Sequence, residues 1–222
     1  MNKELVISAY DKSLDWLSSI NEDTKITIYR KGDTLPLTGN EIRVKNIGRC
    51  VHTFFNHIYQ NYDNLSDITF FAQDYPFDHW EDLVSVVNDN TWENRYTIKI
   101  NGYYGFHFNT ITSPGPLGGI MWKLSPSTQH GNGNVLICDS NGRPQDNNPN
   151  IDVDSYWSKL FLSDKPSNYE FIPGGHFGIT KETIKYRDKD FYGKIVDLLE
   201  NEVTAPWMIE RLECYIFNKQ IK

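Results

Sequence analysis

Apolar residues in the N-terminal half of the chain alternate between short continuous runs and runs with helical spacing. Short runs are typical of buried strands, and spacing of three or four residues is typical of helices. In chain order, the predicted elements are a strand at 5–7, a helix at 14–20, a strand at 25–29, a helix at 51–65, a strand at 68–72 and a helix at 80–87. This alternation predicts an α/β fold with a mostly parallel central sheet flanked by helices.

The segment from the long helix to the strand at 68–72 is the most regular part of the pattern. Asp74 follows this strand almost directly and begins an acidic loop. Ligands of open α/β sheets bind beyond the carboxyl ends of the strands, which makes Asp74 a candidate functional residue. The alternative is a turn-forming aspartate, since Asp is common before sequences such as Tyr75-Pro76.

The rest of the chain has one irregular part and a helical end. Residues 101–150 are rich in Gly, Asn, Pro and Ser and predict an irregular insertion over the site, and residues 34–45 predict a loop. Further elements are predicted as a helix at 154–162, a strand at 177–179, helices at 181–186 and 191–199, and a last helix from Pro206. We expect one domain spanning residues 1–222.

The composition of the chain limits which partners it can bind and where in the cell we expect it. The formal net charge is −7 and no dense basic run is present, so the footprint of a nucleic-acid-binding protein is missing. Cys50, Cys138 and Cys214 lie far apart and fit neither a disulfide framework nor a zinc-ligand spacing. No apolar stretch is long enough to cross a bilayer. We expect a cytoplasmic protein without a membrane span.

Other candidate residues lie near helix and strand ends. Arg49 stands at the predicted N-terminus of the long helix, beside a turn containing Asn46 and Gly48. Helix N-termini attract anions and arginine binds phosphate in a bidentate manner, so Arg49 is a candidate phosphate ligand; the alternative is a solvent-exposed arginine. His79 and His176 adjoin predicted strand ends, where a histidine is a metal ligand, a proton carrier or a structural residue.

Three segments of the chain resemble the uncharacterised family of domains of unknown function numbered 3431. They are residues 46–79, 173–199 and 206–219, in the family's order. The family name implies no activity.

A weaker similarity links the chain to glycosyltransferases with the GT-A fold, the fold of nucleotide-diphospho-sugar transferases, and to family 2 in particular. Their pattern is a turn of the form Asn-x-Gly, a helix, and a short apolar strand ending in Asp-x-Asp. Residues 46–48 match the turn and residues 70–74 match the strand with its acidic end. The match departs at Ala72, which stands where the first aspartate belongs. The resemblance implies a single-domain GT-A-like fold and a glycosyltransferase acting on a nucleotide-sugar.

The resemblance also implies roles on the donor side. Tyr10 would stack on the nucleotide base and Asp33 would accept a hydrogen bond from the ribose. Asn46 and Arg49 would bind the diphosphate at the turn and the helix N-terminus.

Metal binding is the part of this implied site that the departure at Ala72 affects most. Asp74, helped by Asp78 and His79, would hold a divalent cation, Mn²⁺ or Mg²⁺, whose preferred ligands are oxygens. A site that neutralises the diphosphate with Arg or Lys, without metal, stays open as the alternative.

On the acceptor side, the resemblance implies that Gly175 and His176 contact the acceptor and that Glu210 deprotonates its hydroxyl group. Glu213 is the competing base, and a surface ion pair is the alternative for Glu210. Two other functions stay open. One is a non-catalytic module of the same fold that binds a glycan or a nucleotide. The other is a glycan hydrolase that uses Asp74 and Glu210 as its carboxylates.

Overall fold

The structure is a computed structural model. It describes residues 1–32, 37, 39, 41–77, 80–89, 98–100, 103–105, 122–124, 152–166, 169–171 and 176–222. Four of the predicted site residues lie outside these ranges: Asp33, Asp78, His79 and Gly175.

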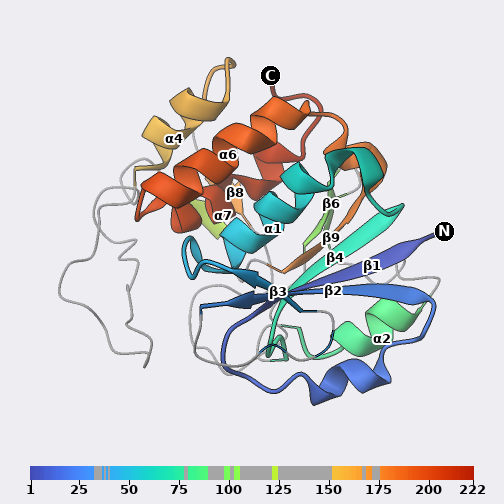
Figure 1. Cartoon of the computed structure of the whole chain (residues 1–222). Coiled ribbons are helices and arrows are strands. Elements are labelled where there is room, and N and C mark those ends of the chain that lie inside the picture. Colours follow the sequence, from blue (N-terminus) through green and yellow to red (C-terminus); the bar gives the residue numbers. More distant parts are fainter. Residues whose placement is uncertain are drawn as a thin grey trace.

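A seven-stranded sheet forms the centre of the fold, with the strand order β3-β2-β1-β4-β9-β6-β5 (Figure 1). Its strands are β1 (Lys3–Ala9), β2 (Thr24–Lys31), β3 (Glu41–Val44), β4 (Ile68–Gln73), β5 (Ile98–Ile100), β6 (Tyr103–Gly105) and β9 (Phe177–Thr180). Strands β3, β2, β1 and β4 pair in parallel, and β9 is antiparallel to both β4 and β6. Because β5 is antiparallel to β6, only β9 and β5 oppose the common direction. The predicted mostly parallel sheet is confirmed. Strands β7 (Trp122–Leu124) and β8 (Tyr169–Phe171) form a separate antiparallel pair.

Helices cover both faces of the parallel part of the sheet. One face carries α1 (Arg49–Gln60), α4 (Val153–Leu160), α6 (Lys189–Asn201) and α7 (Ala205–Ile216), and the other carries α2 (Leu83–Asn88) (Figure 1). The short helices are η1 (Asp15–Ser19), η2 (Tyr62–Asn64) and α5 (Lys181–Ile184). None of the helices within the described ranges is both long and apolar enough to cross a bilayer.

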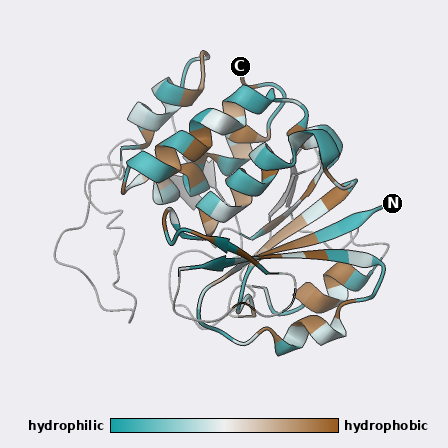
Figure 2. Cartoon of the chain, in the orientation of Figure 1, coloured by the Kyte–Doolittle hydropathy of each residue, from teal (hydrophilic) through white to brown (hydrophobic). Residues whose placement is uncertain are grey.

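Alternating residues of the central strands supply two cores, one on each face. Leu5, Ile7, Phe70 and Ala72 pack with α2, whereas Val6 and Phe71 belong to the core beneath α1, α6 and α7. Apolar residues concentrate on these strands and on the helix sides that face them (Figure 2). Buried aromatic rings fill the larger core: Phe54, Phe55, Phe71, Phe177, Tyr192 and Phe217. Each such ring contributes about 1.5–3 kcal/mol when it is buried, so this face dominates stability.

Three sequence predictions need correction. The segment predicted as a loop at 34–45 contains β3, a four-residue strand whose two charged residues hide its pattern. The helix predicted at 14–20 is the short 3-10 helix η1. The range 101–150, predicted as irregular, contains β6 and β7, and β6 is an internal strand of the sheet.

Candidate functional site

The direction in which successive strands are added to the sheet changes between β1 and β4. This change marks where a ligand site is expected. From β1 the chain adds β2 and β3 on one side, and it then returns to add β4 on the other side. Such a switch point opens a crevice beyond the carboxyl ends of the two central strands, where ligands of α/β sheets bind. Tyr10 follows β1 and Asp74 follows β4, so both residues border the crevice.

Both carboxylate oxygens of Asp74 are engaged with the backbone. Its Oδ2 accepts the N–H groups of Tyr10, Asp11 and Lys12 at 2.8, 3.1 and 3.0 Å, and its Oδ1 accepts that of Tyr75 at 3.1 Å. Asp74 is buried. In this arrangement its carboxylate holds the loop after β1 against the end of β4. The predicted catalytic and metal-binding roles of Asp74 stay predictions.

Tyr10 and Asn46 meet around Gly32, which directly follows β2. Gly32 has a positive φ of 70°, and a Cβ atom there would lie 3.7 Å from the Cβ of Asn46 and 3.9 Å from the ring of Tyr10. The carbonyl of Gly32 accepts a hydrogen bond from Arg43. Two of the predicted donor-side residues are therefore neighbours at the carboxyl edge.

A buried ion pair between Arg30 and Glu41 lies next to the loop that begins at Tyr10 and helps to hold it. Arg30 donates from Nε and from one terminal nitrogen to the two carboxylate oxygens of Glu41, at 3.1 and 2.6 Å. Its other terminal nitrogen reaches the carbonyl of Tyr10 at 3.3 Å. The hydrogen bonds to Glu41 raise the pKa of the Arg30 guanidinium. The bidentate pair thus links β2, β3 and the Tyr10 loop, with fixed geometry.

The turn at residues 45–48, here called the α1 turn, leads into α1 through a left-handed backbone. Gly48 has a φ of 60° and Arg49 has a φ of 52°. A Cβ atom on Gly48 would lie 2.5 Å from the Cβ of His52 and 3.0 Å from the carbonyl oxygen of Leu199, so only glycine fits there. Lys31 donates from Nζ to the carbonyl of Ile47 at 2.6 Å and fixes the turn from inside. No side chain caps the first N–H groups of α1.

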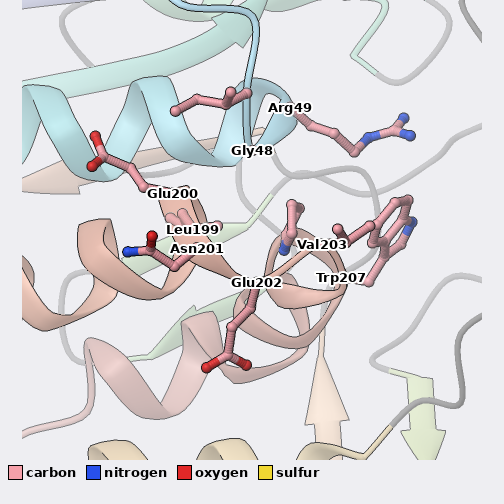
Figure 3. Close-up of a pocket in the computed structure, with 10 residues that line it drawn as sticks. Gly48, Arg49, Leu199, Glu200, Asn201, Glu202, Val203 and Trp207 are labelled. Carbon is pink, nitrogen blue, oxygen red and sulfur yellow. The ribbon is translucent and has the colours of Figure 1, made fainter.

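Arg49 stands at the lip of a small cavity between the α1 turn and the start of α7. Its guanidinium lies over the ring of Trp207, 5.3 Å from the centroid, and it forms no ion pair with another described residue. The cavity has a volume of about 230 Å³. Its lining residues are Ile47, Gly48, Arg49, Leu199, Glu200, Asn201, Glu202, Val203, Pro206 and Trp207. Figure 3 shows Arg49 and Trp207 together on one side, with the carboxylates of Glu200 and Glu202 pointing away from them.

The two acidic residues of this cavity already have partners. Glu200 contacts Nε2 of His52 at 3.2 Å. Glu202 accepts from Lys159 at 2.7 Å and from the hydroxyl of Tyr156 at 2.6 Å. Arg49 is therefore the charged group that this cavity offers to a ligand.

Cys50 marks the point where α1, α7 and the carboxyl edge come together. Burial raises the pKa of its thiol to about 11, and the charges of Arg49 and Glu210 act on the same group in opposite directions. Lys31 acts on the thiol too, and Gln73 at the end of β4 donates to its Sγ at 3.4 Å. Half-buried Glu210 is thus close enough to Cys50 for its charge to act on the thiol, as Arg49 is.

His176 reaches the same edge from β9. It precedes Phe177, which pairs with Phe71, so it lies beside the carboxyl end of β4 and is buried. The structure thus brings six predicted residues to this edge: Tyr10, Asn46, Arg49, Asp74, His176 and Glu210. Sequence reasoning missed Lys31, because a lysine at the end of a strand is normally exposed and carries no signal of burial.

The described residues fit a metal poorly. They contain no group of three His, Cys, Asp or Glu side chains that could hold a metal ion. Ala72, at the position of the missing first aspartate, packs inside the core on the α2 side. Since Asp78 and His79 lie outside the described ranges, the predicted metal site remains a prediction.

A comparison with protein-family models matches residues 5–221 to a family described as protein of unknown function, DUF3431. No curated protein matches the chain, and no solved structure matches it.

Proposed function

Because the chain belongs to DUF3431, a family of proteins of unknown function, we propose its activity from the site: transfer of a sugar from a nucleotide-sugar donor to a hydroxyl group of an acceptor. The observation that carries this proposal is the switch point between β1 and β4, with Tyr10, Asn46 and Arg49 on its border. Crevices of this kind bind nucleotides in other α/β sheets. The similarity to GT-A enzymes is the reason for proposing that the bound nucleotide carries a sugar.

On the donor side, Tyr10 stacks on the base and Arg49 binds the diphosphate in this proposal. Tyr10 is half-buried and its loop is fixed by Asp74, so its ring is preorganised for stacking. The guanidinium of Arg49 has no carboxylate partner among the described residues, and it stands beside the uncapped N–H groups of α1. Asp33 keeps its proposed role at the ribose, by resemblance alone.

On the acceptor side, Glu210 is the proposed general base. It takes the proton of the acceptor hydroxyl as that oxygen bonds to the anomeric carbon of the sugar. The bond from this carbon to the diphosphate breaks at the same time, and its electron pair leaves with the nucleoside diphosphate. The closeness of Glu210 to Arg49, through Cys50, supports this assignment. His176 and Gly175 are proposed to contact the acceptor.

A Mn²⁺ or Mg²⁺ ion held by Asp74, Asp78 and His79 would supply positive charge to the diphosphate. The engagement of both Asp74 oxygens with backbone N–H groups weakens the support for this ion. The proposed transfer does not depend on it.

A non-catalytic nucleotide-binding module is the second candidate, and the burial of Ala72 in the core favours it. Such a module binds the nucleotide but transfers no sugar. A carboxylate-based hydrolase has weaker support, because Asp74 would have to leave its backbone contacts to act.

The testing experiment is a thermal-shift panel of UDP, GDP, CMP and dTDP, with and without Mn²⁺. We expect one nucleotide to stabilise the protein and Tyr10→Ala to reduce the shift. Tyr75→Ala is the matched control, because Tyr75 is an exposed tyrosine beside the same edge. Hydrolysis or transfer of the matching nucleotide-sugar, lost in Glu210→Gln with nucleotide binding intact, would then identify a transferase. A nucleotide shift without any turnover would leave the binding module, and no shift with any nucleotide would reject both.

A further inference from the structure

Lys31 is a buried cation at the carboxyl edge of β2. Its side chain is on the inner side of the α1 turn, and only 3% of the residue is exposed. The ammonium donates one hydrogen bond, to the neutral carbonyl of Ile47. Burial lowers its pKa to about 8, so the group is still protonated at neutral pH.

No carboxylate compensates this charge in the described part of the chain. Lys31 and Arg49 form no ion pair there, although a buried charge is normally paired. Glu210 and Glu213 act on the nearby Cys50, yet neither pairs with either cation. The α1 turn therefore has a buried ammonium behind it, an arginine at its end, and free N–H groups where α1 begins.

A cavity opens at the same turn. Ile47, Gly48 and Arg49 line it, and its volume of about 230 Å³ is below the range of roughly 300–1,000 Å³ usual for drug-sized ligands. Its acidic residues point away from Arg49 and are engaged elsewhere (Figure 3). The space suits a small anion.

From the buried Lys31, the unpaired Arg49 and this cavity, we infer that the α1 turn binds a diphosphate group directly, without a divalent cation between them. This inference rests on the proposed function for the identity of the ligand as a nucleoside diphosphate. Arg49 and the first N–H groups of α1 contact the anion. Lys31 is a positioning residue that holds the turn through Ile47 and adds positive charge from behind, in a setting where charges are weakly screened.

Inorganic pyrophosphate is the probe, and isothermal titration in EDTA gives its affinity. We expect Arg49→Ala to weaken binding about tenfold or more, as expected for a lost contact to a charged group. Lys31→Met should weaken it by a similar factor, because it removes the hydrogen bond that holds the turn and the positive charge behind it. Lys194→Ala removes an exposed lysine of α6, outside the α1 turn, and is the matched control, with a change of less than about twofold because exposed charges are screened.

Melting of the ligand-free variants separates positioning from simple structural support. Removing an uncompensated buried charge does not weaken the fold, so Lys31→Met should melt at or above the wild-type temperature while binding less pyrophosphate. Should Lys31→Met fail to fold, the exposed Arg49→Ala variant still decides. Unchanged affinity in the variants that fold, no binding to the wild type in EDTA, or binding that appears only with Mn²⁺ would each overturn the inference.

The same titration distinguishes this inference from the proposed function. Pyrophosphate binding without binding of any nucleotide would leave the anion site standing and remove the transferase. Nucleotide binding without pyrophosphate binding would remove the anion site and leave the proposed transferase standing.

Discussion

Two buried charges at opposite edges of the parallel sheet, Glu4 and Lys31, differ in how many partners they have. At the amino edge, Glu4 is 1% exposed, and it accepts from Lys25, Thr27 and Ser66 at 2.9, 2.7 and 3.0 Å. His57 lies 3.7 Å from the same carboxylate. At the carboxyl edge, buried Lys31 has a single backbone carbonyl as its partner.

This difference distinguishes charge that stabilises the fold from charge that is available to a ligand. A buried charge with several partners contributes to stability, and its loss leaves those partners unpaired. A buried charge with one neutral partner destabilises the folded state until an anion arrives. Glu4 therefore stabilises the fold at the amino edge, whereas Lys31 at the carboxyl edge is available to a ligand.

The largest expected effect comes from breaking the amino edge. Glu4→Ala should lower the free energy of unfolding by about 3–5 kcal/mol, because it removes several charge-assisted hydrogen bonds at once, from Lys25, Thr27 and Ser66. Urea unfolding at pH 7 measures this loss. Glu22→Ala, at an exposed glutamate, is the control and should change stability by less than about 0.5 kcal/mol. A Glu4→Ala loss as small as that of the control would contradict the comparison.

The second effect is loss of stability in acid, and it belongs to the amino edge as well. Burial lowers the pKa of His57 to about 4, against the opposing effect of Glu4 and with a smaller contribution from Lys25. The unfolded chain therefore binds a proton between pH 6.5 and 4 that the folded chain does not. The contribution of neutral His57 to stability is therefore complete above pH 6.5. It falls by about 2–3 kcal/mol as the pH drops to 4. Glu4, whose pKa is lowered by His57 and by its hydrogen bonds against the effect of burial, adds loss of the same sign below its usual range.

Urea unfolding of the wild type and of His57→Gln, at steps between pH 7 and 4, measures this acid window. The variant should lose most of the slope, since Tyr29 and Asn61, the other groups on the ring, stay neutral there. An equal slope in both proteins would assign the acid loss to other groups.

The third effect lies at the carboxyl edge and at alkaline pH. The lowered pKa of Lys31 means that the folded protein releases a proton near pH 8, whereas the unfolded chain releases it near 10.5. Lys31 should therefore contribute a rise in stability of up to about 3 kcal/mol from pH 8 to 10.5. Of the groups facing Lys31, His52 and the Ile47 carbonyl do not titrate in this range. The Cys50 thiol does: burial raises its pKa from 9.0 to about 11, so above pH 9 it opposes the rise by up to about 2 kcal/mol.

Urea unfolding across this range should show the wild type gaining up to about 3 kcal/mol of stability relative to Lys31→Met, whereas Lys194→Ala, at an exposed lysine of α6, should follow the wild type. A rise that persists in Lys31→Met would mean that Lys31 is not the uncompensated charge of this edge.

The sequence predicts the position of some residues at these two edges and not of others, because only some of them are marked by the pattern of apolar residues. Strands β1 and β4 are apolar runs buried on both faces, so the places of Tyr10 and Asp74 just after them followed from the pattern. The strand order that makes a switch point between them did not, because it depends on how distant segments pair. The core position of Ala72 agrees with that alternation, which explains why no carboxylate stands there.

The uncompensated cation could not be predicted in the same way. A lysine at a strand end is normally at the surface, and Lys31 is buried because the α1 turn packs over it. That packing depends on two consecutive left-handed residues, of which only Gly48 has a sequence signature. The partners of Glu4 come from three separate segments, so their convergence is a property of the tertiary structure.

The smallest expected effect concerns the backbone of Arg49, whose φ of 52° is unfavourable for any residue with a Cβ atom. Arg49→Gly and Arg49→Ala both remove the side chain and its contact with Trp207, but only the glycine relieves the backbone. The glycine variant should be more stable than the alanine variant by about 1 kcal/mol, while both lose pyrophosphate binding equally. Urea unfolding and titration of the same two preparations measure the two quantities. Equal stabilities would mean that Arg49 is not strained. A more stable glycine variant would mean that the fold holds Arg49 at the carboxyl edge against the preference of its backbone.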